Sequence, residues 1–439
     1  MPKSHFDSDD IFTGPETALI VHPLIKNNQS IRSLDAIIEE IEGLTRAIML
    51  EVEHSEVISV NRIQAGAFFG TGQRDNVSRL VSNLKPDVII VNCTLSPVQQ
   101  RNLETAWSVK VIDRTGLILE IFGARAQTKE GRLQVELAAL DYQKSRLVRS
   151  WTHLERQRGG AGFMGGPGER QIEIDRRLIN DRITKLKKEL AVVKRTRDLG
   201  RKSRERKPYP VVAFVGYTNA GKSTLFNALT KADVFAQDLL FATLDPTMRK
   251  IELPNGQDVI LSDTVGFISE LPTHLIAAFR ATLEETIHAD VIMHIIDSSR
   301  SDFEAQREDV ITILEDLGIE YEDNPQIIEV YNKIDLLDED KRAQFDRKAR
   351  FSDNILIVSA KNKTGFDVLL KDISNTLGIS RQYACFIIDY SDGKALSWLH
   401  DHAEIIENEH KDTGVRVVIS IDPAELSKFT SHFGYENQL

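Results

Sequence analysis

The first 125 residues alternate short apolar runs with longer stretches of mixed polarity. Runs rich in Val, Ile and Leu at residues 17–24, 57–63, 87–95 and 109–115 have the character of strands, and residues 33–50 carry an amphipathic helical pattern. Strands that alternate with helices are typical of an α/β unit with a mostly parallel sheet. We therefore predict an N-terminal α/β domain over residues 1–125.

From residue 126 to residue 207 the apolar spacing becomes that of a heptad. Apolar residues from Leu133 to Leu154 recur at spacings of 4 and 3 around one polar interruption at Lys144, and the seam resumes from Ile172 to Val193. The intervening RGGAGFMGGPGER, residues 158–170, holds too many glycines for a helix. Two heptad helices around a breaker predict an antiparallel helical hairpin with a glycine-rich tip.

Pro208 and Pro210 end this hairpin, and a third α/β domain with a mostly parallel sheet is expected over residues 208–379. The last segment, residues 380–439, has strand-like runs at 384–390 and 415–421 and a helical stretch from about 393 to 410. We expect it to form a small α+β domain. The predicted fold class is thus multidomain α/β.

The composition of the 439 residues, 41% hydrophobic and 28% charged, is that of a soluble globular protein. There is no run of 18 apolar residues, so we expect no membrane span. Two distant cysteines argue against a disulfide or zinc framework and favour a reducing compartment. We expect a cytoplasmic monomer, with at most a peripheral association with membranes.

The net charge of −11 hides a strongly basic segment. Residues 170–207 hold 15 Lys and Arg against 6 Asp and Glu, a local charge of +9, which leaves −20 for the rest of the chain. Such asymmetry indicates a polyanionic partner, while the alternative is an ordinary solvated helix face. The RNA-contact candidates on the predicted second helix are Lys185, Lys187, Lys188 and Arg195.

The stretch VVAFVGYTNAGKSTLFNAL, residues 211–229, combines an apolar strand, a glycine-rich turn and a helix. Gly216, Gly221, Lys222 and Ser223 match the phosphate-binding loop, in which backbone N–H groups wrap the β-phosphate, the lysine reaches the β- and γ-phosphates, and the serine ligates Mg²⁺. We expect Tyr217, Thr218, Asn219, Ala220 and Thr224 to complete the nucleotide-binding loop.

Two later loops are expected to select the base. Asn332, Lys333 and Asp335 follow the strand-like run 326–331, and Asp335 would accept from guanine N1–H and N2–H₂, a pairing that adenine cannot make. Ser359, Ala360 and Lys361 follow the run 355–358 and fit the loop whose backbone contacts guanine O6. The order of these loops predicts a GTP-binding domain with its ligand at the carboxyl ends of the strands.

Two segments between these loops are candidates for sensing the γ-phosphate. In LLFATLDPT, residues 239–247, Phe241 is expected at the nucleotide and Thr243 at Mg²⁺, with Thr247 as the alternative ligand. In DTVGF, residues 263–267, Asp263 would hold Mg²⁺ through water and Gly266 would sense the γ-phosphate. The residue that follows is Phe267, where many GTPases carry the glutamine that orients the attacking water.

Taken together, these motifs resemble the HflX family of translation-factor-class GTPases. The resemblance covers nearly the whole chain and is most specific in WTHLERQRGG…GPGE…IDRR, residues 151–177. It implies binding to the large ribosomal subunit under nucleotide control, and the splitting or rescue of idle or stalled ribosomes. It also implies ATP binding by the N-terminal part, for which GTGQRDN, residues 70–76, is the candidate; the alternative is a simple turn before a helix.

Two details bear on this resemblance. The family usually has an arginine before GPGE, where this chain has Gly165, and here Arg170 follows GPGE. Phe163 and Met164 at the tip could stack on rRNA bases or pack back on the hairpin. An apolar residue in place of the catalytic glutamine also occurs in similar GTPases. In several of those GTPases, an asparagine that matches Asn219 of this chain helps to place a K⁺ ion, whose charge would aid hydrolysis. Alternatively, Asn219 only stabilises the turn.

The sequence therefore predicts a GTPase with Lys222, Asn219, Thr243 and Gly266 in catalysis, docked on the large subunit and stimulated by the ribosome. One rival is a GTP-dependent chaperone of large-subunit assembly. Another is an ATP-driven rRNA remodeller that works through the N-terminal domain.

Overall fold

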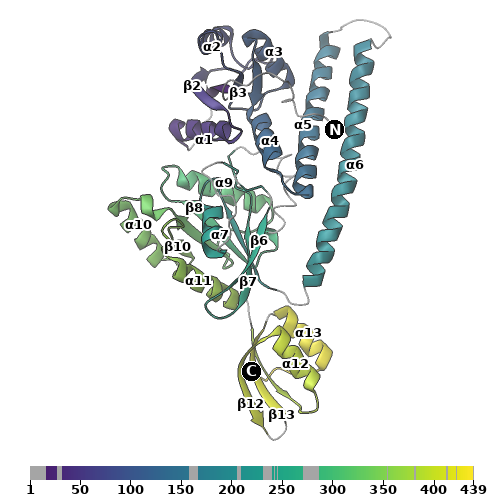
Figure 1. Cartoon of the computed structure of the whole chain (residues 1–439), viewed down its shortest axis with the longest axis vertical. Helices are drawn as coiled ribbons and strands as arrows, with labels where there is room; N and C mark the ends of the chain where they lie inside the picture. The colour runs from purple at the N-terminus through teal and green to yellow at the C-terminus, as the bar shows by residue number, and fades with distance from the viewer. Residues whose placement is uncertain are drawn as a thin grey trace.

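The computed structural model describes residues 16–26, 32–157, 167–204, 209–230, 240–241, 243–244, 246–269, 286–352, 354–379, 382–411, 414–421 and 423–438. Within these ranges the chain forms three separate sheets, with a long helical hairpin beside the first two (Figure 1). This is the multidomain α/β architecture that the sequence predicts. No helix of the described part of the chain is long and apolar enough to cross a membrane.

The N-terminal domain has a four-stranded parallel sheet in the order β2-β1-β3-β4. Helices α1 and α4 cover one face, and α2 and α3 cover the other. The bounds are β1 Thr17–Ile25, α1 Leu34–Ala47, β2 Glu51–Val60, α2 Thr71–Leu84, β3 Val88–Val91, α3 Pro97–Trp107, β4 Lys110–Asp113 and α4 Arg114–Arg125. Strand β2 begins six residues before the apolar run that predicted it, because an edge strand tolerates the polar residues of EVEHSE.

The predicted hairpin consists of α5, Lys129–Gln157, and α6, Pro167–Arg204, which lie side by side (Figure 1). Ile183 and Leu186 of the heptad seam are buried between them, and Arg182 pairs with Glu136 of α5 at 2.7 Å. Helix α6 begins inside the glycine-rich stretch, at Pro167, since proline suits the first position of a helix.

The third domain has a six-stranded sheet in the order β10-β9-β8-β5-β7-β6, parallel except for β6. Strands β6 and β7, which follow β5 in the chain, lie on one side of it in the sheet, and β8, β9 and β10 lie on its other side. Strand β5 is therefore at the topological switch point, where ligands bind in such sheets. The bounds are β5 Val211–Gly216, α7 Lys222–Thr230, β6 Thr247–Glu252, β7 Asp258–Asp263, β8 Val291–Asp297, α9 Phe303–Asp316, β9 Ile327–Asn332, η1 Ile334–Leu336, α10 Glu339–Arg350, β10 Ile355–Ile357 and α11 Phe366–Ile379.

One apolar cluster continues from the N-terminal domain into the third domain. It contains the inner faces of α1 and α4 together with Phe241, Leu244, Val265 and Phe267. The rings of Phe122 on α4 and Phe241 meet edge to face, with their centroids 4.7 Å apart. The two domains therefore share a core at this contact and are not merely joined by a linker.

The C-terminal domain is a three-stranded antiparallel sheet in the order β11-β13-β12, covered by α12 and α13. The bounds are β11 Gln382–Ile388, α12 Gly393–His402, β12 Glu404–Lys411, β13 Gly414–Ile421 and α13 Pro423–Phe433. The prediction of a helix reaching residue 410 was wrong, because EIIENEHK forms β12. Pairing with β13 overrides the helical preference of its glutamates.

Candidate nucleotide-binding site

The loop between β5 and α7 has a backbone that only glycine permits at two positions. Gly216 and Gly221 have φ angles of 148° and 93°, which strain any side chain. A Cβ atom on Gly216 would lie 2.2 Å from the Ile295 carbonyl oxygen, and one on Gly221 would lie 2.2 Å from Nδ2 of Asn332. The loop thus lies close against β8 and β9, directly before the N-terminus of α7, where phosphates bind.

Lys222 is the buried cation of this loop. Its ammonium donates to the carbonyl oxygens of Gly216 at 3.0 Å and Tyr217 at 2.8 Å. Burial lowers the pKa of Lys222 to about 8, against the opposing attraction of Asp263. Among the remaining loop residues, Thr218 and Ala220 are buried, and Asn219 and Thr224 are exposed. Lys222 is therefore a preoriented donor whose charge an anion would stabilise.

Three predicted metal ligands meet at one point. The Asp263 carboxylate accepts from Ser223 Oγ at 2.7 Å and from Thr243 Oγ1 at 3.1 Å, and the two hydroxyls are 2.8 Å apart. The other carboxylate oxygen of Asp263 is buried without a hydrogen-bond partner in the described structure. Burial also raises the pKa of Asp263. Hard oxygen donors of this kind fit Mg²⁺. Thr247, the alternative ligand, is the first residue of β6.

The base-selecting loops are braced against each other and against the phosphate-binding loop. Asn332 donates to the Ala220 carbonyl oxygen at 2.9 Å and accepts from the Ala360 N–H at 3.0 Å. Asp335 accepts from the Ser359 hydroxyl at 2.6 Å, while Lys361 is exposed. The structure thus brings the predicted guanine-binding residues together, and it assigns Asn332 the role of a brace between loops.

Phe267 is 3% exposed and belongs to the apolar cluster shared with the N-terminal domain. Its N–H donates to the Gly216 carbonyl oxygen at 3.1 Å, and its carbonyl oxygen accepts from the Thr218 N–H at 2.7 Å. Beside it, a Cβ atom on Gly266 would lie 3.1 Å from the Lys222 ammonium nitrogen. Phe267 therefore anchors the DTVGF segment against the phosphate-binding loop.

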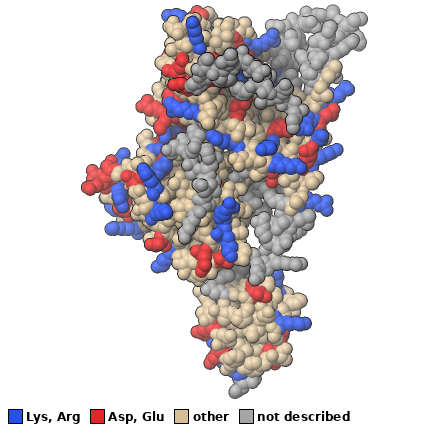
Figure 2. Space-filling model, in the orientation of Figure 1, with Lys and Arg blue, Asp and Glu red and all other residues tan. Residues whose placement is uncertain are grey.

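The basic candidates of the hairpin lie on its outer face. Lys185, Lys187, Lys188 and Arg195 are exposed, and Figure 2 shows lysines and arginines interspersed with acidic residues along this edge of the molecule. Phe163 and Met164 lie outside the described residues, as does the side chain of Arg170, whose backbone is in α6. This exposure fits both phosphate contacts and a solvated face, so RNA contact stays a prediction.

GTGQRDN opens α2, with Gly70 as the N-cap residue. The Gly70 N–H donates to Gln73 Oε1 at 2.7 Å, and the Gln73 amide donates to the Ser59 carbonyl oxygen at 2.5 Å. The side chain of Gln73 thus satisfies the cap. These contacts account for the turn before the helix, and ATP binding by this segment stays a prediction.

Comparison with known proteins matches three family models to successive parts of the chain between residues 35 and 333. Residues 35–123 match the family model "GTP-binding GTPase N-terminal", residues 125–204 match "GTP-binding GTPase Middle Region", and residues 211–333 match "50S ribosome-binding GTPase". The GTPase HflX of Magnetococcus marinus is 48% identical over 94% of both chains. The chain belongs to the GTPase HflX family. It is accordingly a GTPase with a P-loop GTP-binding domain.

Other HflX relatives are similar over most of their length. The GTPase HflX of Escherichia coli is 43% identical over 84% of both chains. Among solved structures, a crystal structure of SsGBP in complex with GDP is 24% identical and has a TM-score of 0.49. The matched region covers 82% of this chain and 98% of the SsGBP chain.

Several residues at the site were not predicted from the sequence. Asp297, at the end of β8, pairs with Lys333 at 2.8 Å and so fixes the lysine of the base-selecting loop. Glu40, Arg32 and Arg114 of the N-terminal domain reach the phosphate side of the site. Glu40 did carry a signal, because it lies at helical spacing between the buried Ala36 and Leu44 on the apolar stripe of α1.

Proposed function

We propose that this GTPase binds the large ribosomal subunit through its helical hairpin and splits or rescues idle or stalled ribosomes. The observation that carries the proposal is the excess of basic residues on α6, with Lys185, Lys187, Lys188 and Arg195 exposed, in an otherwise acidic protein. Lysines and arginines on such a helix neutralise backbone phosphates, which are the main source of affinity for rRNA. The description "50S ribosome-binding GTPase" of the matching family model supports the same partner.

In this proposal GTP lies across the carboxyl ends of β5, β7, β8 and β9. Asp335 selects guanine, and Ser359, Ala360 and Lys361 frame the base. The loop from Gly216 to Thr224 wraps the phosphates, with Lys222 at the β- and γ-phosphates. Ser223 and Thr243 would hold Mg²⁺, with Asp263 acting through water, and the ion would offset phosphate charge. Asn219 is the candidate for placing K⁺.

Hydrolysis in the free protein is slow in this proposal, because the ring of Phe267 cannot orient a water molecule by hydrogen bonding. The ribosome supplies the stimulation. Release of the γ-phosphate frees the segments around Thr243 and Gly266, and ribosome affinity falls as they rearrange.

The proposal is tested by cosedimentation with purified large subunits over a range of salt concentrations. Replacement of Lys185, Lys187, Lys188 and Arg195 by Ala should lower ribosome affinity and flatten its salt dependence by a few units, since each lost phosphate contact contributes about 0.9. Subunit-stimulated GTP hydrolysis should fall in parallel, while GDP affinity of the isolated protein should stay unchanged.

A matched control removes the same charge from the third domain. Lys341, Arg342, Arg347 and Arg350 are four exposed basic residues of α10, and their replacement by Ala should leave cosedimentation near that of the wild type. Equal losses of ribosome affinity in the two variants would show that the effect comes from net charge and not from the position of the residues on α6. Binding to assembly intermediates but not to mature subunits would favour the assembly-chaperone function instead.

A further inference from the structure

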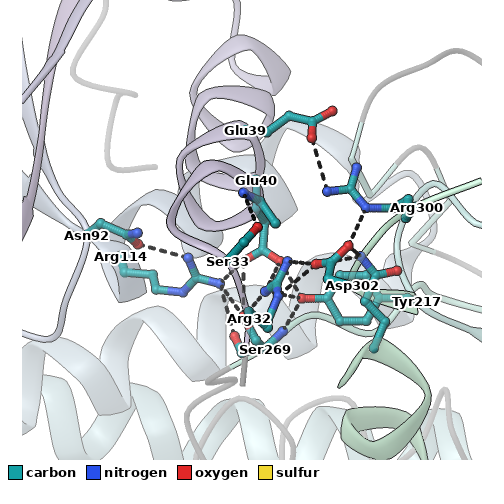
Figure 3. A network of polar contacts seen from close by, with 12 residues as sticks. Arg32, Ser33, Glu39, Glu40, Asn92, Arg114, Tyr217, Ser269, Arg300 and Asp302 are labelled. Atoms are coloured by element: carbon teal, nitrogen blue, oxygen red, sulfur yellow. Dashed lines mark hydrogen bonds and ion pairs between the residues drawn. The ribbon is translucent and has the colours of Figure 1, made fainter. Parts of the chain in front are cut away.

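A buried polar network joins the N-terminal domain to the phosphate side of the GTP site (Figure 3). At its centre is Glu40 of α1, whose side chain is 4% exposed. One carboxylate oxygen accepts from Arg32 at 2.7 Å and from the Tyr217 hydroxyl. The other accepts from Arg114 at 2.5 Å and from Ser269 Oγ at 3.1 Å. Each oxygen thus binds one arginine of its own domain and one hydroxyl of the GTPase domain.

The two hydroxyls belong to different functional segments. Tyr217 is the second residue of the phosphate-binding loop, and Ser269 lies two residues beyond Phe267. The Ser269 N–H donates to the Tyr217 hydroxyl at 2.8 Å, and its carbonyl oxygen accepts from Arg114 at 3.0 Å. The N–H, the hydroxyl and the carbonyl of Ser269 are therefore all held by the network.

The carboxylate is charged when it holds these groups. Burial favours the neutral acid, but Arg114 and Arg32 outweigh it and keep the pKa of Glu40 below its ordinary value. A buried ion pair adds little net stability, because desolvation offsets its attraction. Its larger effect is to fix the positions of the groups that it binds.

Helix α1 also contacts the other segment expected to sense the γ-phosphate. A Cβ atom on Gly43, three residues after Glu40, would lie 3.1 Å from Leu240 Cδ1. Ion pairs from Arg32 to Asp302 at 2.8 Å and from Arg300 to Glu39 at 3.1 Å tie the same region to the start of α9. One helix of the N-terminal domain thus reaches both sensing segments.

We propose that Glu40 is a positioning residue for GTP hydrolysis, supplied by the N-terminal domain. By fixing Tyr217 and Ser269 relative to each other, it holds the DTVGF segment on the phosphate-binding loop, with Gly266 beside Lys222. The N-terminal domain then contributes to the geometry of the reacting end of the nucleotide and not to the binding of the base.

The test measures GTP hydrolysis and GDP affinity of the full chain separately, because the proposal rests on hydrolysis at this site. Glu40→Gln should lower kcat about ten- to a hundredfold, the scale of a displaced reacting group. The KM for GTP and the Kd for GDP should change less than twofold. Glu42→Gln, on the same helix but bonded to Arg46 and Ser55, is the matched control and should behave as the wild type.

Ser269→Ala removes a contact from the other side of the network without leaving a charge unpaired. It should also lower kcat, and its effect should largely disappear when Glu40 is already Gln, because both changes break one interaction. Equal kcat in folded Glu40→Gln and wild type, or fully additive effects, would overturn the proposal. If Glu40→Gln does not fold, Ser269→Ala decides alone, with unchanged kcat as the contrary result.

Discussion

The two ends of the GTP site differ in what holds them. On the base side, Asn332, Asp335 and Ser359 are bonded to neighbours within the GTPase domain. On the phosphate side, Tyr217 and Phe241 contact residues of the N-terminal domain. The residues predicted to select the base thus have these contacts within one domain, whereas the residues predicted at the reacting end contact two domains. The GTPase domain alone is expected to choose its nucleotide correctly but to hold its γ-phosphate sensors loosely.

The largest expected effect comes from cutting the shared core. Phe122 is 1% exposed and packs on Phe241, so Phe122→Ala should cost about 3–5 kcal/mol of stability through the cavity that it leaves. Hydrogen exchange should accelerate around residues 240–244 and 263–269. Loops 332–335 and 359–361 should exchange as in the wild type, and acceleration there would contradict the division into two ends.

Base selection should fail without any effect on the domain contact. Asp335→Asn should weaken GDP binding by about 1–3 kcal/mol, the value of a charged hydrogen-bonded pair, and should improve binding of xanthosine diphosphate. Calorimetric titration measures both affinities. Asp338→Asn is a nearby control, since Asp338 caps α10 through the Lys341 N–H; a similar loss of GDP affinity there would undermine the role of Asp335.

Contacts on the phosphate side of the site should make nucleotide affinity depend on pH, whereas contacts on the base side should not. The pKa of Lys222 is lowered to about 8 in the free protein, and bound phosphates would raise it again, so nucleotide binding takes up a proton above that pH. Below the lowered pKa, affinity should be flat; above it, affinity should fall by up to about tenfold per pH unit. Titrations in two buffers of different ionisation enthalpy report the proton uptake, and constant GDP affinity from pH 7 to 9 would refute it.

The smallest effect concerns a monovalent cation. Asn219 is exposed at a φ of 60°, so Asn219→Gly removes its side chain without backbone strain. If Asn219 places K⁺, replacement of K⁺ by Na⁺ should slow hydrolysis severalfold, and the variant should lose this difference. Equal rates in the two salts, with large subunits present, would leave Asn219 with a structural role in the turn.

The base side and the phosphate-binding loop were predictable because their residues are contiguous and their spacing follows from phosphate and guanine chemistry. Gly216, Gly221 and Asp335 could be placed from short motifs alone. The network around Glu40 could not, since it joins residues separated by up to 270 positions, and no local pattern reports such pairing. In the C-terminal domain, glutamates favoured a helix where pairing with β13 formed a strand.

The shared core has a consequence for how the chain is made. The N-terminal domain leaves the translating ribosome first, while the residues of the third domain that complete the shared core are still missing. Phe267, which belongs to the same apolar cluster as Phe122, is synthesised 145 residues after it. At roughly 5–20 residues per second this delay lasts about 7–30 s. During that interval the side chain of Phe122 lacks its partner Phe241 for part of the time, so we expect slower translation through the hairpin to lengthen the exposure of this apolar contact surface.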